Sequence, residues 1–342
     1  MKSLRVLVLM HEDLVPPEEP GDVDMLAVPW KTEFDIVSTL REMGHEARPL
    51  GVRSDLRVVR EVIEEWQPHI AFNLLEEFDG VATYDQNVVA YLELLRVPYT
   101  GCNPRGLMLS RDKALSKKIL AYHRIPCPDF AVFPVGRAVR RPRRLSFPLI
   151  VKSLTEDASL GISQASVVES DEKLRERVTF IHESLGTSAI VERYIEGREL
   201  YVSVVGNRRL SVFPVWELRM EGLPDEAHPI ATQRLKWSRP YQKKYGIRWG
   251  EARGLPEPVA RRVQDLAKRI YRTLGLSGYA RIDFRLAADG TLYFIEANPN
   301  PEIAKNQEFA TAAKHDGLDY PELLHRILAL GISRAKAGVS VG

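Results

Sequence analysis

The segment YARIDFRLAADGTLYFIEANPNP, residues 279–301, contains two alternating runs of apolar residues on either side of Asp289-Gly290. An Asp-Gly pair between such runs is typical of a β-hairpin with a two-residue type I′ turn. This turn predicts one apolar face, on which the pairs are Ile282 with Ala297, Phe284 with Ile295, and Leu286 with Tyr293. One side of the hairpin is therefore expected to face a hydrophobic core.

The other face of this hairpin is charged. The same register places Asp283 opposite Glu296 and Arg281 opposite Asn298, and all four point the same way because side chains alternate along a strand. Opposed side chains in antiparallel strands are about 4.5–5.5 Å apart, so two carboxylates there repel each other. Either Arg281 compensates within a plain surface charge network, or bound Mg²⁺ does, since this cation prefers oxygen ligands. The hairpin alone leaves both interpretations open.

The size and charge of the chain limit the classes of protein to consider. With 342 residues the chain exceeds one typical core, so two or three domains are expected. Its 48 Lys and Arg against 46 Asp and Glu give a net charge of +2, which does not favour nucleic acid or membrane surfaces as partners. The two cysteines form no CxxC pair, so neither zinc nor a disulfide framework is indicated. No apolar stretch is long enough to cross a membrane, and the expected location is the cytoplasm.

The first hundred residues alternate between predicted strands and helices, which indicates a parallel sheet with helices on both faces. Ligands of such sheets bind beyond the carboxyl ends of the strands, so residues 73–80 form a candidate substrate loop. The expected strands are 4–10, 46–50, 69–75 and 97–101, and the expected helices are 31–45, 56–67 and 84–96.

After Arg105 the pattern changes to helices and antiparallel strands. The fold class is therefore α/β in the first part of the chain and α+β in the second. The expected elements are a helix at 110–125, a strand at 147–153, strands between 188 and 219, a long helix at 257–276 and a final helix from 317.

Lys152 ends the apolar strand 147–153 and precedes a loop of small residues that contains Gly161. A lysine in this position can point at a phosphate, and the backbone N–H groups of Ser159, Leu160 and Gly161 can cover it. A strand-end lysine that simply extends into solvent is the commoner arrangement. This stretch alone does not decide between them.

Glu192 and Glu199 lie on either side of a turn at Gly197. Glu192 follows an apolar run, where a carboxylate is costly unless it accepts hydrogen bonds. An adenine amino group or a ribose hydroxyl would supply such bonds, and so would neighbouring cations in a salt-bridged edge strand.

These features occur in a characteristic order, and here the chain resembles the ATP-grasp superfamily, most closely its D-alanine–D-alanine ligase branch. The resemblance covers about residues 4–332. It rests on the stretches PYTGCNPRGLMLSRDKALSKKIL, FPLIVKSLTEDASLGIS, VERYIEGRELYVSVVG, GLSGYARIDFRL and LYFIEANPNP.

The resemblance implies an ATP-grasp fold behind an N-terminal parallel-sheet domain. The implied parts are an N-terminal domain at 1–105, a central subdomain with the phosphate loop at 106–190, and a C-terminal subdomain with the metal site at 191–342. It also implies an ATP-dependent carboxylate–amine ligase, which forms an amide through an acyl phosphate.

The resemblance assigns roles residue by residue. Arg281 steadies charge on the reacting carboxylate, and Lys236 lies near the γ-phosphate on a mobile loop. The loop 157–161 closes over the phosphates, and two Mg²⁺ ions, or Mn²⁺ in their place, bind the hairpin. The implied ATP-binding residues are Lys113, Lys152, Ser159, Leu160, Gly161, Glu192, Arg193, Tyr194, Ile195 and Glu199, and the implied metal ligands are Asp283, Glu296 and Asn298.

The chain departs from the branch near the expected amino-acid pockets. Asn73 stands where the branch has a histidine, and Phe78 stands where it has an acid. Ala158-Ser159 replaces a Ser-Ser pair, Lys236-Trp237 replaces Lys-Tyr, and 298–309 reads NPNPEIAKNQEF in place of a stretch like NTSPGMT. Glu33 has no clear match to the branch's substrate glutamate.

These departures predict an amino acid or peptide substrate other than D-alanine. A true D-alanine–D-alanine ligase and a non-catalytic ATP-binding module remain alternatives, and a homodimer remains open. A nicotinamide-dependent enzyme ranks lowest, because no GxGxxG follows the first strand.

Overall fold

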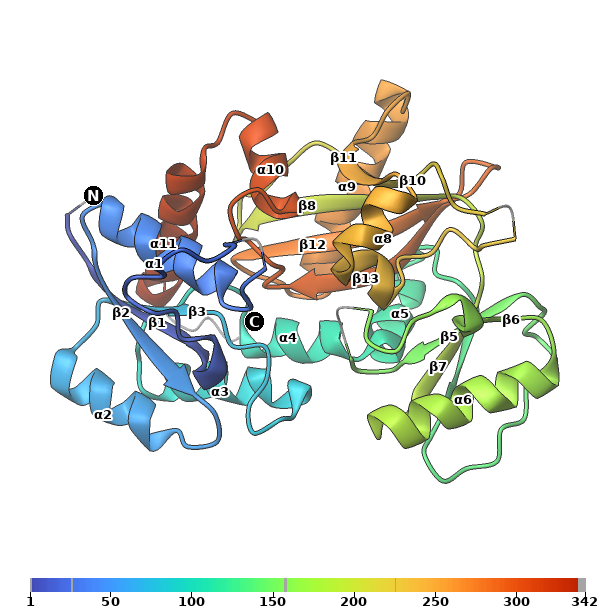
Figure 1. Ribbon diagram of the computed structural model, residues 1–342, viewed down its shortest axis with the longest axis horizontal. Helices are drawn as coiled ribbons and strands as arrows, with labels where there is room; N and C mark the ends of the chain where they lie inside the picture. The colour runs from blue at the N-terminus through green and yellow to red at the C-terminus, as the bar shows by residue number, and fades with distance from the viewer. Residues whose placement is uncertain (1, 26, 157–158, 225, 338–342) are drawn as a thin grey trace.

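The computed structural model describes residues 2–25, 27–156, 159–224 and 226–337, whose strands form three sheets (Figure 1). The first is the predicted parallel sheet, in which β1 lies between β2 and β3. The run Val6–Met10 in β1 is fully buried, which explains its unbroken apolar character. The predicted strand 97–101 is reduced to an isolated bridge between Tyr99 and Ala71. The elements of this part are β1 (Arg5–His11), α1 (Lys31–Glu42), β2 (Glu46–Val52), α2 (Arg57–Trp66), β3 (Ile70–Asn73) and α3 (Asp85–Leu94).

Two helices, α4 (Pro104–Arg111) and α5 (Lys113–Tyr122), lead from the parallel sheet to the rest of the chain. The prediction of one helix over 110–125 is wrong, because Asp112 interrupts it in an extended conformation. Its carboxylate accepts hydrogen bonds from the backbone N–H groups of Ala114 and Leu115, as an N-cap does. Lys113 is thereby fixed as the first residue of a new helix.

The second sheet is antiparallel, with strand order β4-β7-β5-β6, and α6 packs against it. Ser170 caps the start of α6, and Gly186 ends it with a left-handed φ of +65°. The strands and α6 enclose a hydrophobic core of their own, drawn from residues 133–191. The elements are β4 (Phe130–Phe133), β5 (Leu149–Ser153), β6 (Val167–Val168), α6 (Asp171–Leu185) and β7 (Ala189–Arg193).

The third sheet is the largest, with strand order β11-β10-β8-β12-β13 and β9 paired to β8. The apolar stripe of α9 includes Val263, Ala267 and Ile270, and it packs against β8 and β12. The predicted helices at 257–276 and from 317 correspond to α9 and α11. The elements are β8 (Arg198–Gly206), β9 (Leu210–Val212), β10 (Trp216–Met220), α7 (Gln233–Trp237), α8 (Arg239–Lys244), β11 (Ile247–Glu251), α9 (Glu257–Thr273), β12 (Tyr279–Leu286), β13 (Leu292–Pro299), α10 (Glu308–His315) and α11 (Tyr320–Lys336).

The turn of the β12–β13 hairpin differs from the prediction. Ala287 N–H donates to the carbonyl of Thr291 and Gly290 N–H donates to that of Ala287, with a φ of +81° at Gly290. These bonds define a three-residue loop, in which glycine takes the left-handed position. The predicted apolar pairs therefore shift: Phe284 pairs with Phe294 and Leu286 pairs with Leu292.

A β-bulge at Ile295 restores the predicted register further along the hairpin. Asp283 lies opposite Glu296 and Arg281 lies opposite Asn298, as expected from the sequence. In a bulge two residues of one strand oppose one residue of its partner. Without it, the register of the turn would place Glu296 opposite Ile282, on the face that α9 covers.

The parallel sheet and the large sheet share their hydrophobic cores. One core contains Leu7 together with Ile282, and another contains Val6 together with Tyr279. The C-terminal helix α11 packs against β3 and α1, so the last helix of the described chain covers the parallel sheet (Figure 1). The boundaries at 105 and 190 stay predictions. No helix in the described ranges is long and apolar enough to span a membrane.

Candidate active site

A cavity lies between the second sheet (β4-β7-β5-β6, called the central sheet below) and the β8–β12–β13 face of the large sheet, and it gathers most of the predicted site residues. Among the described residues, Gly161, Arg281 and Asn298 are the predicted site residues outside its lining. The predicted residues that line it are Lys113, Lys152, Ser159, Leu160, Glu192, Arg193, Tyr194, Ile195, Glu199, Lys236, Asp283 and Glu296.

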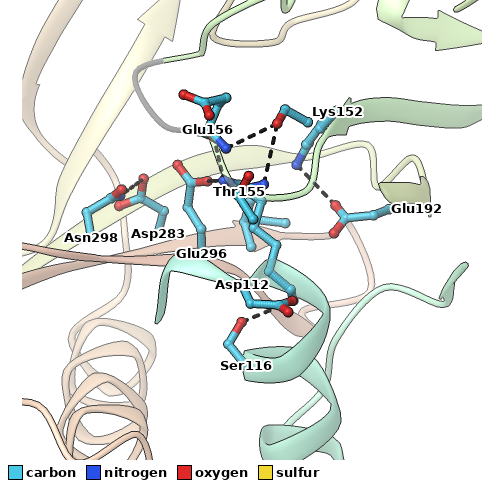
Figure 2. Close-up of polar contacts among 12 residues, drawn as sticks. Asp112, Ser116, Lys152, Thr155, Glu156, Glu192, Asp283, Glu296 and Asn298 are labelled. Atoms are coloured by element: carbon cyan, nitrogen blue, oxygen red, sulfur yellow. Dashed lines mark hydrogen bonds and ion pairs between the residues drawn. The ribbon is translucent and has the colours of Figure 1, made fainter. Parts of the chain in front are cut away.

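Glu192 is buried at one end of the cavity, between two lysines. Its Oε2 lies 3.0 Å from Nζ of Lys152, which comes from the neighbouring strand β5 (Figure 2). Its Oε1 lies 2.9 Å from Nζ of Lys117 on α5, although this ion pair lacks hydrogen-bond geometry. Burial alone would raise the pKa of Glu192, but the two lysines together lower it below its usual value. Lys152 therefore does not extend into solvent in this structure.

Sequence reasoning missed Lys117. It is fully buried, a rare state for lysine that an amphipathic helix pattern does not reveal. The available signal was its spacing, since Lys117 follows Lys113 by four residues and so shares its helix face.

The segment after Glu192 forms an apolar end of the cavity. Tyr194 and Ile195 are buried, and Tyr194 packs in one cluster with Ile150 and Ile230. Arg193 donates a 2.8 Å hydrogen bond to the hydroxyl of Tyr293 on β13. This end offers apolar walls to a flat ring, beside the Oε1 atom of Glu192.

Glu199 lies across the turn from this segment and is held by two donors. Arg285 donates to its Oε2 at 2.7 Å, and the Tyr201 hydroxyl donates to its Oε1 at 2.6 Å. Arg285 also donates to the carbonyls of Gly197 and Pro229, so it ties the turn to the hairpin. Sequence reasoning missed Arg285, although it continues the alternation of Arg281 and Asp283 along one face of β12.

The predicted phosphate loop lies over Lys113. Nζ of Lys113 donates a 2.7 Å hydrogen bond to the carbonyl of Glu156. Further along, Ser159 and Gly161 have left-handed φ values of +59° and +71°. Residues 157–158, and with them Ala158 and part of the predicted closing loop 157–161, lie outside the described residues.

The far end of the phosphate loop is bound to α7. Gly161 N–H donates to Oε1 of Gln233, and Gln233 N–H donates to the carbonyl of Ile162. The N–H of Gly161 is therefore already engaged, which differs from the expectation that it covers a phosphate. Lys236 follows on α7 and lines the cavity. The two segments that were expected to meet the γ-phosphate thus contact each other.

The polar face of the hairpin forms the other end of the cavity. Figure 2 shows Asp283, Glu296 and Asn298 on one side of the hairpin, facing the loop that carries Glu156. Arg281 donates two hydrogen bonds to Asp283, of 2.8 and 3.0 Å, and Asn298 donates one of 3.1 Å. The predicted cluster of four polar residues is confirmed.

The two carboxylates at this end of the cavity have pKa shifts in opposite directions. Burial raises the pKa of Asp283 to about 6, even though Arg281 opposes the shift. Burial also acts on Glu296, but Lys113, Lys236 and other nearby cations overcome it and lower its pKa to about 2. Nζ of Lys113 lies 3.8 Å from the Glu296 carboxylate. Positive charge is therefore already directed at this end of the cavity.

The donor set of this end fits Mg²⁺. Two carboxylates and an amide are hard oxygen donors, and Mg²⁺ commonly completes its shell with water and substrate phosphates. In the described part of the chain no three His, Cys, Asp or Glu side chains gather closely enough to hold a metal ion by themselves. A site here would therefore depend on oxygens from a bound phosphate.

Arg281 joins this end to the C-terminal loop. It lies 3.2 Å from Glu308 at the start of α10, and its guanidinium stacks over the ring of Tyr201 at 4.9 Å. Arg281 is thus held between Asp283 and Glu308, close to the hairpin but outside the cavity lining.

The residues that depart from the ligase branch have structural contacts of their own. The side-chain oxygen of Asn73 accepts a hydrogen bond from the N–H of Leu75, and Phe78 packs against the core. Glu33 is buried on α1, and its pKa rises to about 7, chiefly through burial. The side chain of Trp237 lies outside the described part of the structure.

The chain resembles known proteins in sequence. Residues 119–329 match the family model described as the D-ala D-ala ligase C-terminus. A D-alanine–D-alanine ligase of Desulforudis audaxviator is 32% identical over 87% of this chain and 92% of its own. The uncharacterized protein y4sG of Sinorhizobium fredii is 29% identical over 88% of each chain.

The fold has a close counterpart among solved structures. The crystal structure of a D-alanine–D-alanine ligase from Bacillus anthracis, described in complex with ATP, superposes with a TM-score of 0.75. The match covers 98% of this chain and 99% of that one at 23% identity, so it bears on the fold. The expected ATP-grasp fold is confirmed, and the family match and the Desulforudis relative show that the chain belongs to the D-alanine–D-alanine ligase family, a family of ATP-grasp ligases.

Proposed function

We propose that the protein is an ATP-dependent carboxylate–amine ligase that forms an amide bond through an acyl phosphate. One observation carries the proposal: a single cavity joins an apolar end, two inward-facing lysines and a carboxylate-lined hairpin. These are the features that a nucleotide base, its phosphates and their metal ions require, in that spatial order.

The base and ribose of ATP fit the end of the cavity near Glu192. Ile150, Tyr194 and Ile230 supply apolar surface for adenine. Oε1 of Glu192 is ion-paired with Lys117 but accepts no hydrogen bond within the described part of the chain, so it has lone pairs that could accept one from the adenine amino group. Glu199 already accepts from two protein donors, but a carboxylate has further lone pairs for a ribose hydroxyl.

The phosphates then extend towards the hairpin, past Lys113 and Lys152. Both lysines line the cavity, and so do Ser159 and Leu160 of the loop. Asp283, Glu296 and Asn298 would hold two Mg²⁺ ions, with Mn²⁺ as an alternative, beside the terminal phosphates. Such ions neutralise charge on the transferring phosphoryl group.

In the proposed reaction a substrate carboxylate oxygen attacks the γ-phosphorus and ADP leaves. An amine nitrogen then attacks the acyl carbon, inorganic phosphate leaves and the amine loses a proton. Arg281 and Lys236 direct positive charge at the reacting groups, where preorganised charge has its largest effect. The phosphate loop and α7 exclude water, which would hydrolyse the acyl phosphate.

We further propose that at least one substrate differs from D-alanine. Asn73 and Phe78 are engaged in local structure instead of presenting charge to a substrate. Arg281 is paired with Glu308 at the start of α10, and Glu302 lies in the preceding loop between β13 and α10. These acids would attract the ammonium group of an amino acid or peptide substrate. The relatives that are D-alanine–D-alanine ligases support the rival assignment to D-alanine itself.

The deciding measurement is Mg²⁺-dependent release of ADP and phosphate. D-alanine alone is compared with panels of L-amino acids, bulky amino acids and dipeptides, and the product is identified by mass. Efficient formation of D-alanyl-D-alanine, better than any other pair, would show that the substrate is D-alanine. ATP binding without turnover of any pair would favour a non-catalytic module.

A further inference from the structure

Lys117 lies behind residues that line the cavity, and its own side chain has no contact with solvent. It is fully buried on α5, and it is not among the described residues that line the cavity. Burying an ammonium ion is costly unless it is paired, and burial lowers the pKa of Lys117. Lys117 therefore pays this cost without lining the cavity, and its function has to be sought in the residues that it contacts.

Its ammonium connects two strands that belong to different sheets. Nζ of Lys117 is 2.9 Å from Oε1 of Glu192 on β7, and it donates a hydrogen bond to the backbone carbonyl of Ile295 on β13. The same atom lies 5.2 Å from the centre of the Phe294 ring, an additional cation–π contact. One buried charge therefore contacts both the base end of the cavity and the metal hairpin.

The contact with Glu192 matters because the second lysine beside Glu192, Lys152, is also expected to bind the nucleotide phosphates. Lys152 is 3.0 Å from Glu192 and also lies in the cavity, where the proposed function gives it a phosphate. Once phosphates arrive, one ammonium serves two anions. A buried carboxylate with insufficient compensation takes up a proton. Lys117 cannot reach the nucleotide, so its charge stays with Glu192.

The second contact matters because Ile295 is the bulged residue. The bulge turns both Ile295 and Glu296 into the cavity and places Glu296 opposite Asp283. A bulge leaves part of the strand ladder unpaired. Lys117 supplies a donor for the carbonyl at this position, and so stabilises the register on which the metal face depends.

We propose that Lys117 is a positioning residue that keeps Glu192 ionised while nucleotide phosphates share Lys152, and that fixes the Ile295 bulge so that Glu296 faces the metal ions. This inference rests on the proposed function. It assigns Lys117 no contact with substrate.

The test of the first half is proton uptake on nucleotide binding. Wild type, Lys117→Met and the exposed control Lys118→Met are titrated with Mg²⁺ and AMP-PNP by calorimetry, in buffers of different ionisation enthalpy. Lys117→Met should take up about one proton more than wild type, and its Kd should weaken by about tenfold per pH unit above neutrality. Lys118→Met should match wild type. Wild-type affinity and proton uptake in Lys117→Met would overturn the inference.

Adding Glu192→Gln provides the second variant. The double variant Lys117→Met/Glu192→Gln should lose the extra proton uptake, because the charge that required it is gone. If Lys117→Met does not fold, recovery of folded protein in the double variant supports charge compensation, and failure to recover overturns it. If wild type itself does not bind AMP-PNP, the proposed function fails instead, and the two failures are distinct.

The second half is tested by comparing kcat with KM. Glu192→Gln alone is the matched control for the double variant, since both lack the carboxylate. The double variant should show a kcat at least tenfold below that of Glu192→Gln, with a similar KM for ATP, because Glu296 is misplaced while the base site is unchanged. Equal kcat values would show that Lys117 does not fix the bulge.

Discussion

Replacing Glu33 by glutamine should remove a pH-dependent weakness from the fold. Glu33 is 5% exposed, and its Oε2 has no hydrogen-bond partner among the described residues. Burial, with further contributions from Glu76 and Glu302, raises its pKa from 4.5 to about 7. Because the folded-state pKa is raised, its contribution to stability is fully present below about pH 4.5 and is lost as the pH rises through 7.

The size of the effect follows from this pKa difference. Each pKa unit corresponds to about 1.4 kcal/mol, so ionised Glu33 lowers the free energy of unfolding by about 3 kcal/mol at pH 8. For a chain of 342 residues this corresponds to about 4 °C in Tm. The Glu33→Gln variant has no ionisable group at this position. Its free energy of unfolding should therefore exceed that of wild type by up to this amount as the pH rises.

The assay is thermal unfolding of wild type and Glu33→Gln at half-unit steps from pH 5 to 8. Other carboxylates titrate equally in both proteins, so the difference between the two curves isolates Glu33. Glu42→Gln is the matched control, since Glu42 is an exposed glutamate on the same helix. Parallel curves for wild type and Glu33→Gln would refute the reasoning, because they would show that Glu33 titrates normally in the folded protein.

Three further predictions concern the cavity. Asp283→Asn or Glu296→Gln should abolish Mg²⁺-dependent ADP release while leaving the circular dichroism spectrum unchanged, since each removes a metal ligand from a charged face; turnover at the parental rate would contradict the metal assignment. ATP with Mg²⁺ should raise Tm, because a ligand that binds the folded state stabilises it by mass action. Lys152→Ala should reduce this rise in Tm more than Lys236→Ala, because a lysine on a strand is better fixed. Equal rises in the two variants would contradict this ranking. Arg285→Met should raise the KM for ATP at least several-fold with little change in kcat, because Glu199 loses a donor; an unchanged KM would show that Glu199 does not contact the nucleotide.

The pairing of the polar residues in the hairpin was predicted correctly from the sequence, although the predicted length of the loop was wrong. The Asp-Gly pattern does not distinguish a two-residue loop from a three-residue loop, and the structure has the longer one. The one-residue error this introduces is cancelled by the bulge at Ile295, whose carbonyl accepts from Lys117. A contact between residues 178 positions apart cannot be read from the local pattern.

The candidate site was predictable where a residue type is unusual for its surroundings. Glu192 on an apolar strand signalled a buried charge, and the structure buries it between Lys117 and Lys152. Lys117 and Arg285 were not predicted, because a charged residue on a helix or strand usually faces solvent. Their direction is set by how the sheets pack together, which alternation within one element does not specify.

The separate core of the central sheet has a mechanical consequence for the whole molecule. Displacing the parallel sheet against the large sheet would expose apolar residues from two shared cores, whereas rotating the central sheet with α6 leaves both of these intact. The turn between β7 and β8 is suited to be the pivot, because Gly197 adopts a φ of +145° there and a side chain would collide with the carbonyl oxygen of Leu286. Bending at this glycine would break the hydrogen bond from Arg285 to the Gly197 carbonyl and widen the cavity on the side of the β4–β7–β5–β6 sheet, while the shared cores keep the parallel and large sheets together.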